Sequence, residues 1–310
     1  MGSFALVANP RAGAGRAGRL LPAIEAALRT AGADFVSLRT QAPGHATELT
    51  RQALRDGAEG VAVVGGDGTL SEALNGFFLA SGSPIAKGRW LGPLPAGTGG
   101  DFRRTLGVLS ERPEDLVRRL LFSEPRPIDC GWVRYGDAHG GTGERAFLNI
   151  ASFGLAGVVD QLIAAGPKWL GGRAAYFLAS LQAKASYGRN RRVKVTVDGE
   201  AREHALLNLA VANGRYFGGG MQIAPRARLD DGLFDVVAIE RGGWLGPLAL
   251  TPALYGGGVL GRAGVHARRG RSIHAEALPG EGPVVLDIDG EALGQLPARF
   301  DVREGVLHLR

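Results

Sequence analysis

The sequence predicts two domains of different classes: an N-terminal Rossmann-like parallel α/β domain and a C-terminal, mostly β domain built as an antiparallel β-sandwich. In the first part of the chain, apolar strand patterns alternate with helical patterns, and glycine-rich turns follow two of those strands. After Pro127 the pattern changes to short apolar runs separated by Gly and Asp. We place the boundary between residues 1–125 and 126–310, and the last residues are free to return to the first domain.

The elements of the first domain follow from hydrophobic periodicity. In the first helix, Leu21, Ile24 and Leu28 recur at helical spacing. The expected strands cover residues 4–8, 35–38, 60–64 and 90–94, and the expected helices cover 18–31, 46–56, a segment from 71, and 113–122. Such alternation predicts a parallel sheet with helices on both faces.

The elements of the second domain are mainly short strands rich in Val, Ile, Leu and aromatic residues. They are expected at residues 130–134, 146–153, 192–197, 206–212, 233–239, 272–277 and 284–288. A helical pair at about 157–164 and 174–185 interrupts them.

The composition is that of a globular protein, with 45% hydrophobic and 21% charged residues among 310. Cys130 is the only cysteine, which excludes an internal disulfide framework and fits a reducing cytoplasm. The N-terminus has no signal-peptide pattern. The uncharged stretch between Arg241 and Arg262 holds seven glycines and two prolines, so we expect a packed helix there and no transmembrane segment. The net charge of +6 suits nucleic acid, acidic phospholipid or nucleotide phosphates, and does not choose among them.

The strongest local signal is the turn Gly65-Gly66-Asp67-Gly68-Thr69, which follows an apolar strand and precedes a helix. Glycines let backbone amides approach phosphate oxygens, and the N-terminus of the next helix favours an anion. Asp67 is suited to a phosphate-bound Mg²⁺. The alternative is an ordinary strand-to-helix turn in which Asp67 caps the helix. A second turn of the same design, around Thr98, follows the next strand, and both should face one crevice.

Three blocks of sequence resemble the nucleotide site of the diacylglycerol and sphingosine kinase family. They are Asn9-Pro10 with Gly13 and Gly15, GGDGTLSEALNG at 65–76, and PAGTGGDFRRTLG at 95–107. The likeness continues through 147–149 and 224–234, so it covers nearly the whole chain. The family usually has asparagine where this chain has Gly100. The resemblance implies a fold like that of NAD kinase and diacylglycerol kinase.

By this resemblance, ATP is held by residues of four loops. They are Asn9, Thr40, Gly65, Gly66, Asp67, Gly68, Thr69, Leu70, Ser71, Glu72, Gly97 and Thr98. From the residues alone, Thr40 is equally well a turn threonine. Asp101 is expected either to orient Mg²⁺ or the substrate hydroxyl, or to cap the helix that begins at Phe102.

A lipid hydroxyl needs a general base, and two Asp-Gly-Glu turns are candidates. One carries Glu200 and the other Glu291, and each Asp-Gly also suits a two-residue hairpin. The bare sequence does not separate them. The resemblance selects Glu291, because the family's C-terminal Asp-Gly-Glu carries the catalytic glutamate.

The resemblance also implies a structural Mg²⁺ site made by the Asp231 carboxylate and the carbonyl oxygens of Arg228 and Leu233. Oxygen ligands suit this ion. Without the resemblance, Leu-Asp-Asp-Gly is equally a turn.

These features predict a cytoplasmic, ATP- and Mg²⁺-dependent lipid kinase of phospholipid metabolism, with diacylglycerol as the first substrate to test. The expected partner is a lipid at the inner membrane face, contacted peripherally, and not nucleic acid; the oligomeric state, with a homodimer as one option, stays open. The alternatives are an NAD kinase-like enzyme and a non-catalytic nucleotide- or lipid-binding regulator.

Overall fold

The computed structural model describes residues 2–97, 99–108, 112–137, 140–165, 191–240 and 246–310. The chain divides into two compact units. The first unit is Met1–Cys130 together with Glu304–Arg310, and the second is Gly131–Arg303.

The first unit is built on a parallel sheet with strand order β2-β1-β3-β4. The strands are β1 (Phe4–Ala8), β2 (Phe35–Arg39), β3 (Gly60–Gly65) and β4 (Trp90–Pro95). β1 and β3 are buried along their whole length, as expected for central strands of a sheet covered on both faces. The end of β14 (Glu291–Leu309) lies parallel to β4, with His308 opposite Trp90.

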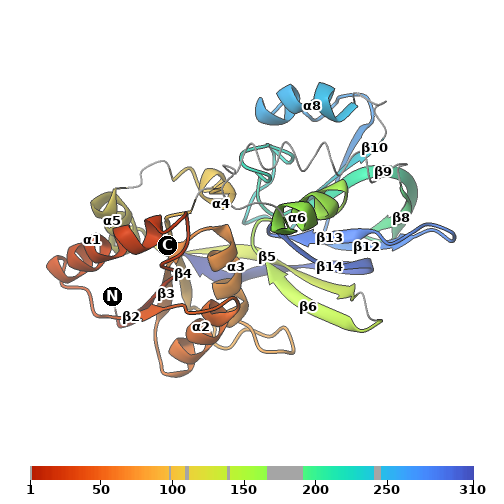
Figure 1. Ribbon diagram of the computed structural model, residues 1–310. Coiled ribbons are helices and arrows are strands. Elements are labelled where there is room, and N and C mark those ends of the chain that lie inside the picture. The colour runs from red at the N-terminus through yellow and green to blue at the C-terminus, as the bar shows by residue number, and fades with distance from the viewer. Residues whose placement is uncertain (1, 98, 109–111, 138–139, 166–190, 241–245) are drawn as a thin grey trace. The chain divides into compact units, whose positions relative to one another are not determined.

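Helices cover both faces of this sheet (Figure 1). They are α1 (Arg16–Thr30), α2 (His45–Arg55), α3 (Asp67–Gly76) and α5 (Pro113–Phe122), and the short α4 (Asp101–Thr105) follows the turn after β4. α1 packs with α5, and α2 packs with α3. Apolar residues of α1 and α5, such as Leu21 and Leu116, form a core with Phe4 and Leu6 of β1. The predicted parallel α/β architecture is confirmed.

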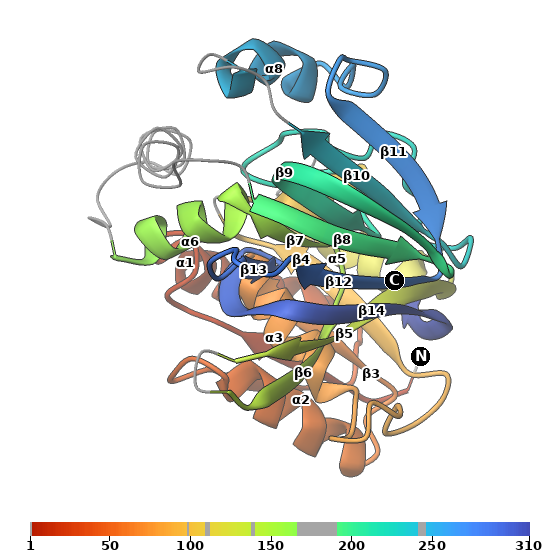
Figure 2. The same ribbon diagram turned by 90° about the vertical axis from the view of Figure 1, so that its right-hand side faces the viewer.

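The second unit is an antiparallel β-sandwich, also as predicted (Figure 2). Its strands are the later part of β5 (Arg126–Gly136), β6 (Thr142–Phe147), β7 (Ile150–Gly154), β8 (Arg191–Val197), β9 (Glu200–Ala212), β10 (Phe234–Glu240), β11 (Val265–Gly270), β12 (Ser272–Ala277), β13 (Val285–Ile288) and most of β14. β9 pairs with β8 through its first half and with β7 through its second half. β14 pairs with β13 and then with β12. The two long strands therefore take part in both layers, around a core that includes Phe147, Phe234 and Phe300.

Two described helices belong to the second unit, α6 (Leu155–Ala165) and α8 (Gly246–Tyr255). Leu155 of α6 and Leu254 of α8 pack in a second core with Ala210 of β9 and Val237 of β10. Nowhere in the described part of the chain is a helix both long and apolar enough to cross a bilayer.

The strand pattern differs from the sequence-based expectation in two places. The strand expected at 146–153 is two strands, β6 and β7, separated at Leu148 and Asn149. β11 and β14 were not predicted; their sequences carry many charged residues, and Gly294 and Pro297 lie inside β14. The helix expected at 174–185 lies outside the described residues.

Candidate functional site

Three loops of the first unit meet where β1, β3 and β4 end. A Cβ atom added at Gly97 would lie only 2.5 Å from the Cα of Gly66. A Cβ at Gly13, where φ is +60°, would lie 2.4 Å from the carbonyl oxygen of Ala96. Contacts this short exclude any side chain, so glycine is required at these positions. The two glycine turns therefore lie against each other, as the sequence predicts.

Asn9 links the loop after β1 to helix α3, which follows the loop after β3. Its Nδ2 donates a hydrogen bond of 3.1 Å to Oγ1 of Thr69, and its Oδ1 accepts one from the backbone N–H of Arg11. The backbone N–H of Asn9 also donates to the carbonyl oxygen of Val64 in β3. These bonds hold the loop after β1 beside the start of α3.

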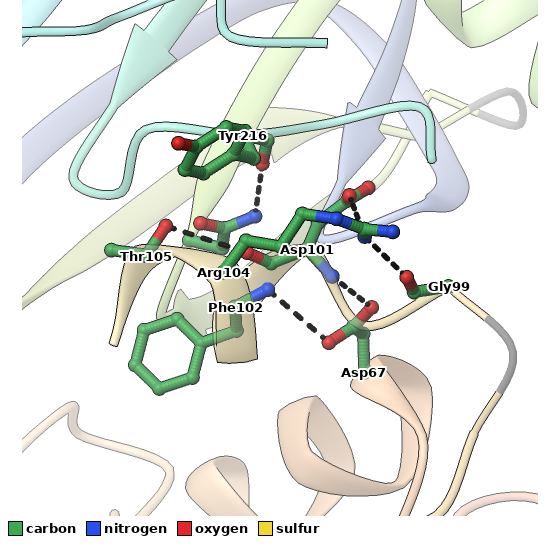
Figure 3. A network of polar contacts seen from close by, with 8 residues as sticks. Asp67, Gly99, Asp101, Phe102, Arg104, Thr105 and Tyr216 are labelled. Carbon is green, nitrogen blue, oxygen red and sulfur yellow. Dashed lines mark hydrogen bonds and ion pairs between the residues drawn. The ribbon is translucent and has the colours of Figure 1, made fainter. Parts of the chain in front are cut away.

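Asp67 binds the N-terminus of α4 rather than capping its own helix (Figure 3). Its Oδ2 accepts a hydrogen bond of 2.9 Å from the N–H of Asp101, and its Oδ1 accepts a longer one from Phe102. Both are N–H groups that the helix itself leaves unpaired. Because a carboxylate has about four lone-pair sites, these two bonds leave capacity for a cation as well.

Asp101 is nearly buried, with 8% of its surface exposed, and its carboxylate is paired. Oδ1 lies 2.9 Å from Nη1 of Arg104, one turn further along α4, and the same Nη1 donates to the carbonyl oxygen of Gly99. The helix begins at Asp101 itself, and its side-chain cap comes from Asp67. The alternative in which Asp101 caps this helix is therefore not observed, and its expected role with Mg²⁺ or the substrate hydroxyl stays a prediction.

Gly100 keeps the turn before α4 in the left-handed region, with φ +66° and ψ 40°. Asparagine is the non-glycine residue that adopts this conformation most readily. The glycine thus preserves the backbone bend expected with asparagine, and the only loss is a side chain.

A hollow lies between the ends of β3 and β4 and helix α4. It is lined by both glycine turns and by α4, through Gly66, Asp67, Gly97, Phe102 and Arg103 among others. Thr98, expected to contact the nucleotide, lies outside the described residues.

Of the other expected nucleotide residues, Gly65 and Leu70 line this hollow. Gly68 and the buried Ser71 belong to α3, and Thr40 donates its N–H to Ala8 at the end of β1.

Glu72 contacts α2. Its Oε2 accepts a hydrogen bond from the N–H of Ala46, and its carbonyl oxygen accepts one from the hydroxyl of Thr47. The assigned roles of all these nucleotide residues stay predictions.

The two Asp-Gly-Glu turns of the second unit are both two-residue hairpins, as predicted. Asp198 and Asp289 have φ of 46° and 52°, and a glycine with positive φ follows each. Their glutamates differ. The side chain of Glu200 is 71% exposed and contacts Arg268, whereas that of Glu291 is 35% exposed.

Arg145 of β6 holds Glu291. Its Nη1 lies 2.8 Å from Oε2, and the arginine side chain is only 17% exposed. Sequence reasoning missed Arg145, because β6 begins before the strand expected at 146–153 and Arg145 lies 146 positions from Glu291. Arg104 was also missed, although its spacing of three from Asp101 on a predicted helix was a usable signal.

Asp289 fixes the hairpin to the break between β6 and β7. It accepts hydrogen bonds from the N–H groups of Leu148, Asn149 and Ile150. Burial raises the pKa of the Asp289 carboxyl, and these three bonds oppose the rise. Asn213 supports the same break by donating to the carbonyl oxygen of Leu148. Glu291 therefore stands on a rigid turn.

At the expected Mg²⁺ site, the Asp231 carboxylate has a positively charged side chain as one of its partners, and the metal site stays a prediction. Oδ1 accepts a bond from the N–H of Leu233, and Oδ2 is paired with the guanidinium of Arg269. Arg269 also lies 3.5 Å from the buried carboxylate of Asp235. Burial raises the pKa of the Asp235 carboxyl. The positive charge of Arg269 opposes this rise, and the negative charge of Asp231 adds to it.

Arg228 pairs with Asp230 in the same turn. Within the described residues, no group of three or more His, Cys, Asp or Glu side chains is placed to hold a metal. Arg269 supplies the positive charge at this turn.

Comparisons with known proteins identify the family. Residues 3–133 match the diacylglycerol kinase catalytic domain, and residues 149–310 match the YegS C-terminal NAD kinase beta sandwich-like domain. The chain is 30% identical to a diacylglycerol kinase of Mycobacterium tuberculosis over 310 residues, which is 100% of this chain and 95% of the relative. The chain belongs to the diacylglycerol kinase family. The resemblance drawn from the three glycine blocks is thereby confirmed.

Two further relatives support the assignment of this chain to the family. The chain is 34% identical to the "Probable lipid kinase YegS-like" of Pseudomonas aeruginosa, over 92% of this chain and 87% of the relative. The crystal structure of a candidate diacylglycerol kinase from Bacillus anthracis superposes with a TM-score of 0.78 and 26% identity, covering 99% of this kinase and 94% of that chain. Yeast NADH kinase shares the fold alone, with a TM-score of 0.53, 9% identity and coverage of 100% and 82%.

Proposed function

We propose that this kinase transfers the γ-phosphate of ATP to a hydroxyl group of a lipid, with diacylglycerol as the acceptor. The observation that carries the proposal is the contact between the two glycine turns beside Asp67. A triphosphate is bound by closely spaced backbone N–H groups and a carboxylate for its cation, and glycine turns beside Asp67 support this assignment.

The residues for the nucleotide are those of the three loops. Gly97 and Gly13 let these loops approach one another where any Cβ would collide with backbone. We assign Asp67 to the magnesium that accompanies ATP. Mg²⁺, when bound there with the triphosphate, would neutralise the charge that develops during transfer. Arg103, which lines the hollow, adds positive charge on the same side.

Glu291 is proposed as the general base. It accepts the proton of the lipid hydroxyl while that oxygen forms its bond to the γ-phosphorus, and the bond to the β–γ bridging oxygen breaks to release ADP. Arg145, whose Nη1 lies 2.8 Å from Oε2, fixes the orientation of the carboxylate. Asp289 and its three backbone bonds hold the turn that presents it.

Diacylglycerol is the first acceptor because the Mycobacterium tuberculosis relative bears that name, while the Pseudomonas aeruginosa relative is named only as a lipid kinase. The NAD kinase alternative has support from the fold but from none of the relatives described above. The regulator alternative rested on Gly100, whose left-handed conformation keeps the turn intact.

The experiment supplies ATP and Mg²⁺ with diacylglycerol in mixed micelles, with a bacterial lipid extract, or with NAD, and locates the transferred phosphate by mass spectrometry. We expect phosphatidic acid in the first reaction and no phosphorylated NAD. Asp67→Ala should abolish the product. Phosphate on NAD alone would move the kinase to the alternative class, and no product from any acceptor would support the regulator.

A further inference from the structure

The side chain of Tyr135 lies near the proposed base, on one face of the adjacent strands β6, β5 and β14. β5 pairs with β6 on one side and with β14 on the other. Tyr135 of β5 lies opposite Gly143 of β6. Arg145 follows Gly143 by two residues, so its side chain is on the same face and is a diagonal neighbour of Tyr135. Arg145 in turn holds Glu291 at 2.8 Å.

Two glycines on the neighbouring strands make room for the Tyr135 ring. A Cβ atom added at Gly143 would lie 2.6 Å from Cζ of the ring, and one added at Gly294 of β14 would overlap Cδ2. Gly294 has a φ of +74°, which favours glycine by itself, whereas Gly143 is not among the residues with positive φ. A glycine inside a strand weakens the strand unless something packs closely on it, and the ring accounts for Gly143. The ring is therefore held in a defined place across the sheet.

The hydroxyl of Tyr135 has no part in this packing, because a phenylalanine ring would cover the same two glycines. Within the described part of the chain the hydroxyl has no hydrogen-bond partner, although the side chain is half-buried. Burial raises the pKa of the hydroxyl. The charge of Arg145 opposes this rise, and the charges of Glu291 and Asp137 add to it. The phenol therefore keeps its proton at neutral pH and is a hydrogen-bond donor near the proposed base.

We propose that Tyr135 determines acceptor specificity: its hydroxyl donates a hydrogen bond to the ester carbonyl on the carbon next to the reacting hydroxyl of diacylglycerol. The inference rests on the proposed function, because it takes Glu291 as the site of the reacting hydroxyl. A sphingoid base carries an ammonium group at the adjacent carbon. That group has no lone pair to accept the bond, and the charge of Arg145 repels it. The site therefore selects acylated glycerols over sphingoid bases.

The test compares kcat/KM at saturating Mg-ATP for three acceptors in mixed micelles. They are diacylglycerol, an analogue in which an ether replaces the ester next to the reacting hydroxyl, and sphingosine. The parent should prefer the ester to the ether roughly threefold to tenfold, the net effect of one hydrogen bond, and should use sphingosine least. Tyr135→Phe should lower kcat/KM for the ester by the same factor and leave that for the ether unchanged.

The matched control is Tyr255→Phe, which removes a phenol hydroxyl from an exposed residue of α8. Its preference for the ester should equal that of the parent. Both variants keep the aromatic ring, so both should unfold at the parent's temperature.

Three results would overturn the role of Tyr135 while leaving the proposed kinase reaction intact. They are equal use of ester and ether by the parent, an undiminished preference in Tyr135→Phe, and an equal loss of preference in Tyr255→Phe. Phosphorylation of sphingosine by the parent as readily as diacylglycerol would overturn the selectivity. No phosphorylated lipid from any acceptor would instead overturn the proposed function, and this inference with it.

Discussion

Three carboxylates are predicted to be catalytic from the sequence, and each has a different partner. Asp67 accepts bonds from backbone N–H groups, Asp101 is paired with Arg104, and Glu291 is paired with Arg145. The side chain of Glu291 is 35% exposed, whereas that of Asp101 is 12% exposed. Glu291 is therefore the better placed of these two to meet an acceptor from solution.

Replacing Arg145 tests whether it positions the proposed base. In Arg145→Gln the ion pair that orients Glu291 is lost, so kcat for phosphate transfer should fall about tenfold to a hundredfold while the KM for ATP stays at the parent value. Arg145→Lys, which keeps the charge, should restore part of the lost kcat. The measurement is kcat and the KM for ATP of each variant.

The control is Arg134→Gln. This substitution removes an exposed arginine of the neighbouring strand β5 that is paired with Glu144 of β6. Its kcat should match that of the parent. A parental kcat in Arg145→Gln, or a loss of kcat that Arg145→Lys does not reduce, would exclude a positioning role for Arg145.

At the scale of elements, the proposed nucleotide site consists of loops that each follow a strand. The turn after β3 and the turn after β4 lie in contact through Gly66 and Gly97, and Asp67 reaches across to the start of α4. The positions of the loops follow from the parallel sheet, whose strands all end at one edge.

Gly97→Ala should separate the two turns. The added Cβ would lie 2.5 Å from the Cα of Gly66, which is backbone and has to move. We expect the KM for ATP to rise roughly tenfold to a hundredfold, as small displacements of a binding loop do. Gly258→Ala is the control, because its Cβ meets nothing within 4 Å. An unchanged KM for ATP in Gly97→Ala would exclude these turns from nucleotide binding.

The stability of the protein tests whether Arg269 or a metal ion holds the turn at Asp231. With Arg269 in place, EDTA should leave the unfolding temperature unchanged. Arg269→Ala should lower stability by about 1 to 3 kcal/mol, since two carboxylates lose their partner. Arg268→Ala removes the preceding arginine of the same strand, β11, and breaks its ion pair with Glu200. This substitution should change the free energy of unfolding by less than about 0.5 kcal/mol. A lower unfolding temperature of the parent in EDTA would show that a metal holds the turn instead.

Sequence patterns predicted elements best where burial is one-sided or complete. The range 113–122 of α5 and the range 272–277 of β12 match the structure residue for residue. β14 escaped prediction because it alternates between partners, carries Pro297 and changes exposure along its length. The break at Leu148 was hidden because its polar partner, Asp289, is remote in sequence.

The candidate site was predictable in part for the same reason. Glycines and Asp67 are local signals in one turn, and Asn9 precedes a proline at a strand end. The contacts that orient the acids are not local. Arg145 meets Glu291 only because β6 and the β13–β14 hairpin come together in the folded unit, and no pattern in the bare sequence pairs them.

At the scale of the whole molecule, the chain leaves the first unit near Cys130 and returns to it at Glu304. Leu307 and Leu309 are almost completely buried there. Arg310 donates to the carbonyl oxygens of Leu120 and Leu121 at the end of α5. The last residues therefore contribute to the stability of the unit that carries the glycine turns.

Leu309→Ala should destabilise that unit by about 2 to 5 kcal/mol, the range for a buried leucine replaced by alanine. The measurement is denaturant unfolding followed by the fluorescence of the tryptophans, one of which, Trp90, lies in β4 beside this strand. Leu79→Ala, at a partly exposed position, should cost far less. Equal effects of the two substitutions would mean that the C-terminal strand does not support the first unit.

The central claim is that Glu291 takes the proton from a lipid hydroxyl as the phosphate of ATP is transferred. The most direct measurement is the rate of phosphate transfer to diacylglycerol by Glu291→Gln, with Glu200→Gln as the control on the twin turn and Mg-ATP affinity measured for both. We predict a rate lower by ~10² to 10⁴-fold for Glu291→Gln alone, with unchanged Mg-ATP affinity. A parental rate in Glu291→Gln, or an equal loss in Glu200→Gln, would contradict the account.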